Sequence, residues 1–99
     1  MQAYYEERFE REMGCTEAEW LRWLPQAVGD HFWKTQDQTA GVRIGDGALG
    51  LKWQVLEPRV IGLARFPRLL VNFRFGGVDE ATRQVFMKRF DLFMHRGGG

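Results

Sequence analysis

The sequence predicts an α+β fold in which an antiparallel sheet of three to four strands is flanked by N-terminal helices and by one long C-terminal helix. Three observations predict this class. Apolar residues recur with helical spacing near both ends of the chain, those between residues 42 and 75 alternate with the strand period of two, and glycines and prolines separate these stretches. The expected element order is α-α-β-β-β(-β)-α.

The first helix is expected over residues 3–13. Tyr5, Phe9 and Met13 recur every four positions, as apolar residues on one helix face do. Gly14 follows and is expected to end this helix.

A capping box predicts where the second helix begins. Thr16 opens the stretch "TEAE", in which its hydroxyl can accept a hydrogen bond from the backbone N–H of Glu19 while the Glu19 carboxylate reaches back. Pro25 has no N–H and is expected to kink or restart the helix. Gly29 is expected to end it.

The strands are expected to begin after residue 31. Val42 and Ile44 alternate with polar or small residues, "GDG" at 45–47 offers a tight turn, and apolar residues alternate again over 49–55. This pattern predicts a hairpin with one buried face.

A second turn is expected at "LEPR", residues 56–59, because it contains a proline between two extended stretches. The next strand would run over residues 60–66. Pro67 would interrupt it before residues 68–75 resume an extended conformation.

The last element is expected to be a long helix that opens at Asp79, a good N-cap, with Glu80 placed favourably at the positive end of the helix dipole. The helix would run to residue 96. The chain is therefore predicted to be a single domain over residues 1–96, followed by a flexible glycine tail at 97–99.

Length and composition narrow the class of protein. The 99 residues contain no apolar run near the roughly 20 residues that a membrane helix needs, and the N-terminus lacks the pattern of a signal peptide, so we expect a cytoplasmic protein without a membrane partner. Cys15 is the single cysteine and has only His31 and His95 to join it, which predicts no metal site and no cofactor.

Signals for catalysis are weak. Asp30 and His31 could form a general-base pair only if a nucleophile came near, and no phosphate-binding loop or nucleophile motif is present. The sequence therefore predicts a protein that is not an enzyme.

Charge is distributed unevenly along the chain. Residues 1–30 carry seven acidic residues against three arginines, whereas residues 31–99 are net basic. Four arginines and no acidic residue lie between Pro58 and Val78, and these are Arg59, Arg65, Arg68 and Arg74. They predict one alternative function, which is nucleic-acid binding, with RNA as the expected partner, through the basic segment 59–74.

The stretch "RLLVNFRF", residues 68–75, separates its aromatic and basic side chains. Phe73 and Phe75 are expected on one face of the strand, and Arg68 and Arg74 on the other. An RNA-stacking surface needs exposed rings beside cations on one face. The two phenylalanines are therefore expected in the core beneath the last helix.

Two resemblances accompany these patterns. The expected order of helix, three strands and helix resembles that of double-stranded-RNA-binding domains and of the Alu-binding proteins of the signal recognition particle. The former begin their second helix with a basic cluster, whereas the matching helix here begins with Asp79 and Glu80. The segment "PRLLVNFRFGGVDEATRQVFMKRFDLFMHRGGG" resembles the C-terminal part of small uncharacterised proteobacterial proteins, which implies a bacterial origin and no particular function.

Apolar residues exceed what one sheet contact requires. In the last helix, Val85 and Leu92 lie outside the main apolar arc, and Ile61, Leu63 and Leu70 lie on the strand face opposite the phenylalanines. Either the N-terminal helices cover this second face, or it is an exposed surface for a partner. The predicted interaction surface comprises Ile61, Leu63, Leu70, Val85, Arg89, Leu92 and Arg96.

The favoured function is therefore a non-catalytic protein-interaction or assembly module, with a second copy of the chain or another protein as partner. A possible dimer is included in this prediction. A further alternative is a small-ligand pocket lined by Trp20, Trp23, Trp33 or Trp53.

Overall fold

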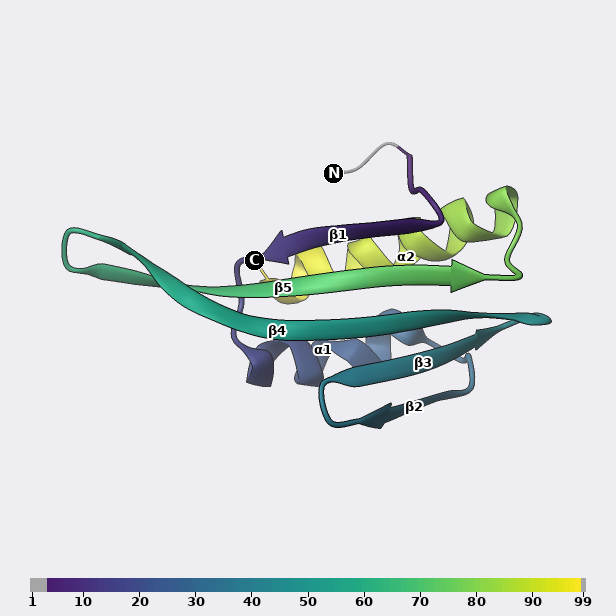
Figure 1. Cartoon of the computed structure of the whole chain (residues 1–99), viewed down its shortest axis with the longest axis horizontal. Coiled ribbons are helices and arrows are strands. Elements are labelled where there is room, and N and C mark those ends of the chain that lie inside the picture. Colours follow the sequence, from purple (N-terminus) through teal and green to yellow (C-terminus); the bar gives the residue numbers. More distant parts are fainter. Residues whose placement is uncertain (1–3, 99) are drawn as a thin grey trace.

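A five-stranded antiparallel sheet with two helices forms the protein (Figure 1). This computed structural model describes residues 4–98, and side chains over residues 4–95. The strands are β1 (Arg8–Met13), β2 (Trp33–Gln36), β3 (Thr39–Ile44), β4 (Gly47–Ile61) and β5 (Ala64–Gly76), and the helices are α1 (Glu17–Val28) and α2 (Glu80–Gly98). The strand order is β1-β5-β4-β3-β2, so the first strand lies beside the last.

Both helices cover the same face of the sheet, α2 behind β1 and β5 and α1 behind β4 and β3 (Figure 1). The core lies between this face and the helices. Its largest fully buried side chains include Trp20 from α1, Trp53 from β4, Phe73 from β5 and Phe90 from α2. The burial of the strands alternates, and no helix among the described residues covers the second sheet face, which we call the open face.

The predicted fold class is wrong in its first element, because residues 8–13 form an edge strand and not a helix. Side chains return to the same face about every four residues in a helix and every two residues in a strand. Phe9 and Met13, four positions apart, therefore lie on one face of either element. The position between them, Arg11, reads as polar, yet its side chain also turns toward the core. Tyr5 precedes the strand and is fully buried.

The helix predicted from the capping box is confirmed as α1. Thr16 Oγ1 accepts a hydrogen bond from the backbone N–H of Glu19 at 3.1 Å, and Glu19 Oε1 accepts one from the backbone N–H of Thr16 at 2.9 Å. Pro25 lies inside the continuous helix. Gly29 ends it with a φ of 73°, a conformation that favours glycine.

The turn predicted at residues 56–59 is wrong. β4 continues to Ile61, a two-residue turn at Gly62 and Leu63 follows, and β5 runs without interruption from Ala64. The pairing of β4 with β5 shifts register between Leu56 and Arg59, which marks a bulge. Pro58 and Pro67 both lie at this irregularity, where a missing backbone N–H breaks no regular ladder bond.

The strand count is also corrected, from three or four to five. β2 was not predicted because its sequence, "WKTQ", has one partly buried position and three exposed ones, so it carries little apolar alternation. With β1 before α1 and four strands after it, the order differs from the helix, three strands, helix arrangement of double-stranded-RNA-binding domains.

The final helix is confirmed. Asp79 Oδ1 accepts a hydrogen bond from the backbone N–H of Thr82 at 2.8 Å. α2 includes Gly97 and Gly98, which the sequence analysis placed in a flexible tail, and Gly99 lies outside the described residues. Within residues 4–98, neither helix combines the length and the apolar character that crossing a membrane requires.

Candidate functional site

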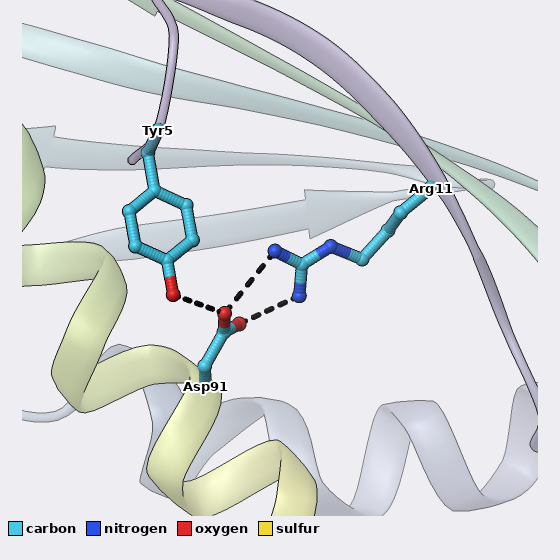
Figure 2. A network of polar contacts seen from close by, with 3 residues as sticks. All are labelled: Tyr5, Arg11 and Asp91. Atoms are coloured by element: carbon cyan, nitrogen blue, oxygen red, sulfur yellow. Dashed lines mark hydrogen bonds and ion pairs between the residues drawn. The ribbon is translucent and has the colours of Figure 1, made fainter. Parts of the chain in front are cut away.

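A polar network fixes β1 at the sheet edge and determines which of its side chains face outward (Figure 2). Tyr5 Oη donates a hydrogen bond to Asp91 Oδ2 at 2.5 Å, and Arg11 Nη1 donates to Asp91 Oδ1 at 2.6 Å. The Arg11 guanidinium also lies 5.0 Å from the ring centroid of Phe73. Burial first, and then the bond to Asp91, raises the pKa of Tyr5 to about 12.

This network orients the strand on the sheet. Because Arg11 faces inward with Phe9 and Met13, the alternate residues Arg8 and Glu10 face the open side. The backbone of Tyr5 is also held, since its N–H donates to Gln84 Oε1 and its carbonyl accepts from Gln84 Nε2.

The first candidate surface is the part of the β4–β5 hairpin that extends beyond the helices, which we call the arm and define as residues 55–68 (Figure 1). Most of its large apolar side chains are exposed instead of buried. Leu63 at the tip is fully exposed, and Val60 and Ile61 are each about 60% exposed. The exposed apolar residues of the arm are Val55, Val60, Ile61, Leu63 and Phe66.

Both faces of the arm carry an apolar residue beside an arginine. The register places Arg59 opposite Phe66, and Val60 opposite Arg65. Successive pairs point to opposite faces of a ribbon. The arm is therefore amphipathic on each side, and neither helix covers it.

Glu12 anchors the base of the arm. Arg68 Nη2 donates to Glu12 Oε1 at 2.7 Å, and Arg59 Nη2 lies 3.7 Å from Glu12 Oε2. The hydrogen bond from Arg68 lowers the pKa of Glu12 below its usual range. Arg68 also donates to the backbone carbonyl of Glu57, so it ties β1 to both strands of the arm.

The second candidate surface is the open face. Cross-strand register aligns Arg8, Arg74, Gly50, Gly41 and Lys34 in one row across all five strands. A neighbouring row contains Glu10, Asn72, Lys52, Thr39 and Gln36.

A shallow depression of about 580 Å³ lies on this face. Three consecutive residues from each of β1, β5 and β4 line it, and these are residues 8–10, 72–74 and 50–52. Arg8, Lys52 and Arg74 supply its positive charge and Glu10 its negative charge. The depression is lined by no tryptophan.

The predicted interaction residues do not form one surface. Ile61 and Leu63 lie on the arm, Leu70 lies partly buried on the open face, and Val85 and Leu92 are exposed on α2, on the opposite side of the sheet. The sequence analysis grouped these positions because periodicity shows which residues share a face of one strand or helix. It does not show which face of the sheet a helix covers.

Two arginines, Arg89 and Arg96, were also predicted to belong to that interaction surface. Arg89 Nη1 donates to the carbonyl oxygens of Ala27 and Gln26 at 3.1 and 3.3 Å, so it satisfies the C-terminal end of α1. Arg96 belongs to α2, but its side chain lies outside the described part of the chain.

The four arginines predicted to contact nucleic acid are also separated. Arg59 and Arg68 hold Glu12, and Arg65 lies on the arm. Arg74 lies on the open face with cations from other strands. Sequence reasoning missed those cations, because Arg8, Lys34, Arg43 and Lys52 come from four separate strands and no local cluster marks them.

The four tryptophans belong to the core or its margin, and His31 lies beside a backbone carbonyl. Trp20 and Trp53 pack edge to face in the core, with ring centroids 5.5 Å apart, and Trp23 and Trp33 pack at its margin. His31 Nδ1 lies 2.9 Å from the Val28 carbonyl oxygen.

Comparison of the chain with protein-family models, with curated proteins and with solved structures found no match.

Proposed function

We propose that the protein is a non-catalytic assembly module that pairs with a second copy of itself through the arm. The observation that carries this proposal is the exposure of Val60, Ile61, Leu63 and Phe66 on a ribbon that extends past both helices. Clustered apolar side chains of this kind on a small protein mark an interaction site.

The edges of the arm favour a second copy as the partner. β1 ends at Met13, opposite Leu69, and β3 reaches only to Lys52 on β4, so within residues 4–98 neither edge of the arm has a neighbouring strand. Such edges readily pair with another chain. The same edge on two copies can pair with itself in antiparallel orientation about a twofold axis, which gives a closed dimer.

The marginal stability of a two-stranded ribbon and the charges of the chain also support pairing of two arms. A two-stranded ribbon is only marginally stable alone, so pairing of two arms would stabilise each of them. Arg59 and Arg65 flank the apolar residues, and residues 1–30 of a second copy carry an excess of carboxylates. Since a standard interface covers about 800 Å² on each partner, we expect Leu70, beside the base of the arm, to join the contact.

Sedimentation equilibrium over a concentration series tests the proposal. We expect the wild-type chain to form a dimer that persists at high salt, because apolar contacts are not screened. Leu63→Asp or Ile61→Asp should give a monomer with unchanged circular dichroism. Val85→Asp is the matched control, since the exposed fraction of Val85 is similar to that of Ile61 but Val85 lies on α2.

Two results would contradict the pairing. One is a wild-type chain that stays monomeric at every concentration, which would leave only a different protein as the partner of the arm. The other is dissociation by Val85→Asp as complete as that by Leu63→Asp, which would move the interface to α2.

A further inference from the structure

We propose that the open face is a binding site for single-stranded nucleic acid. In this site Arg8, Lys34, Lys52 and Arg74 contact phosphates, and Phe32 stacks on a base. This inference is independent of the arm. Of the four arginines that the sequence predicted to contact nucleic acid, only Arg74 belongs to this site.

Positive charge is concentrated on the open face. Outside the arm, its strand positions hold five cationic residues and two acidic ones, a formal charge of +3, whereas the whole chain carries only +1. The cations are Arg8, Lys34, Arg43, Lys52 and Arg74, and the acids are Glu10 and Glu12. The rest of the molecule is therefore net negative, and this face attracts polyanions.

Two arginines lie directly opposite each other at the β1 end of this row. Arg8 pairs with Arg74 in the β1–β5 register, and both line the depression. Like charges at such positions destabilise a sheet. Among the described residues, neither arginine forms an ion pair or a side-chain hydrogen bond. A phosphate held between them would remove the repulsion and would meet guanidinium groups that have no competing partner.

The spread of the cations indicates an extended ligand. The row from Arg8 on β1 to Lys34 on β2 crosses four strand spacings of about 4.8 Å, or about 19 Å. A single phosphate cannot reach both ends. A polymer with regularly spaced charges can contact the whole row.

An exposed ring distinguishes a nucleic acid from other polyanions. Phe32 is 67% exposed, and Lys34 Nζ lies 5.9 Å from its ring centroid. The Phe32 carbonyl accepts from the backbone N–H of Arg43, so Phe32 lies opposite Arg43 at the start of β2. Aromatic rings beside cations are the usual means of holding unpaired bases, and an acidic peptide has no base to stack on such a ring.

The middle of the row is bare backbone. A Cβ atom added at Gly50 would meet only Arg74 O, at an ordinary 3.7 Å, and a Cβ atom added at Gly41 would meet nothing within 4 Å. Packing therefore does not require glycine at either position. Glycine within a strand is common where another molecule approaches the backbone closely, which suits a chain that crosses the face between the cations.

Fluorescence anisotropy with labelled oligothymidylate and oligouridylate tests this site in the full chain. We expect binding with an association constant that depends on salt. The logarithm of this constant should fall linearly with the logarithm of the salt concentration, with a slope of about −0.7 for each phosphate contacted. Lys52→Ala should reduce both the affinity and this slope. Lys88→Ala makes the same charge change on the exposed side of α2 and should alter neither.

Two further variants separate this site from general charge attraction. Phe32→Ala should weaken binding at least about fivefold, which is the lower end of the affinity losses found when an aromatic residue that stacks on a base is replaced by alanine. Gly50→Val keeps the charge and should leave thermal stability equal or higher, because valine favours strands, while it blocks the depression and reduces binding.

Several outcomes would overturn the proposal. They are no binding of either oligonucleotide at low salt, an equal loss of affinity in Lys88→Ala and Lys52→Ala, and full binding by Gly50→Val. Equal affinity for a duplex of the same length, or for poly-glutamate, would show that the face selects charge alone.

Discussion

Arg11 and Asp91 join the first strand of the protein to its last helix, with Arg11 Nη1 2.6 Å from Asp91 Oδ1. Most of both side chains is hidden from solvent, and Tyr5 donates to the same carboxylate. β1 is an edge strand that pairs only with β5 among the described strands, so this ion pair is the main polar tie between the edge and the helical layer.

We expect Asp91→Ala to lower the free energy of unfolding by about 3 kcal/mol, because it leaves the Arg11 charge buried without its partner. Urea denaturation measures this loss. The double variant Arg11→Leu and Asp91→Leu should be closer to wild type, since both charges are then absent. Asp46→Ala, at an exposed turn, is the control and should change little. A loss below about 1 kcal/mol for Asp91→Ala would contradict a structural role for the pair.

Tyr5 gives a prediction at alkaline pH. Its pKa is raised to about 12 in the folded protein, so its contribution to stability is complete below about pH 10, the ordinary tyrosine value, and is lost as pH rises toward 12. Denaturation at several pH values should show wild type converging on Tyr5→Phe across this interval. A constant difference between the two proteins would show that the phenol has the same pKa in both states.

Cys15 is expected to resist thiol reagents. The side chain is buried, and desolvation first, with the charge of Glu19 second, raises its pKa to about 11. At neutral pH its reaction with a chromogenic disulfide should therefore be limited by opening of the fold, and it should become fast in denaturant. Rapid labelling of the native protein would indicate that this part of the structure opens readily.

Thr16→Ala should destabilise the protein by about 1 kcal/mol, because α1 loses the hydroxyl that accepts from the Glu19 N–H. Thr16→Ser keeps this acceptor and is the matched control. Thermal denaturation of the three proteins checks the effect, and equal midpoints would mean that the capping box adds nothing to stability.

Gly47 allows a close approach that no other residue permits. A Cβ atom there would lie 2.3 Å from the carbonyl oxygen of Gly77 and 2.4 Å from that of Gly76. Both contacts are with backbone, so Gly47→Ala should cost several kcal/mol or prevent folding, as overpacking of a rigid site does. Gly41→Ala has open space and should be tolerated. Similar denaturation midpoints for the two variants would contradict the close contact.

Local sequence signals determined the elements whose chemistry is local. The capping box at Thr16, the N-cap at Asp79 and the alternation over residues 42–55 each act within a few positions, and each predicted its helix or strand correctly. The buried face of residues 69–75 was also predicted, since strand alternation separates Phe73 from Arg74 without reference to other elements.

Tertiary structure decided the remainder. Residues 8–13 form a strand because they pair with the edge of β5 and because Arg11 binds the carboxylate of Asp91. The β5 partners lie 56 to 66 residues away in the chain and Asp91 lies 80 residues from Arg11, so no local pattern can show them. The arm continues through Pro58 because a bulge accommodates it opposite Pro67. The cationic row on the open face depends on the register of five strands, so single cations at distant positions become neighbours only when the sheet forms.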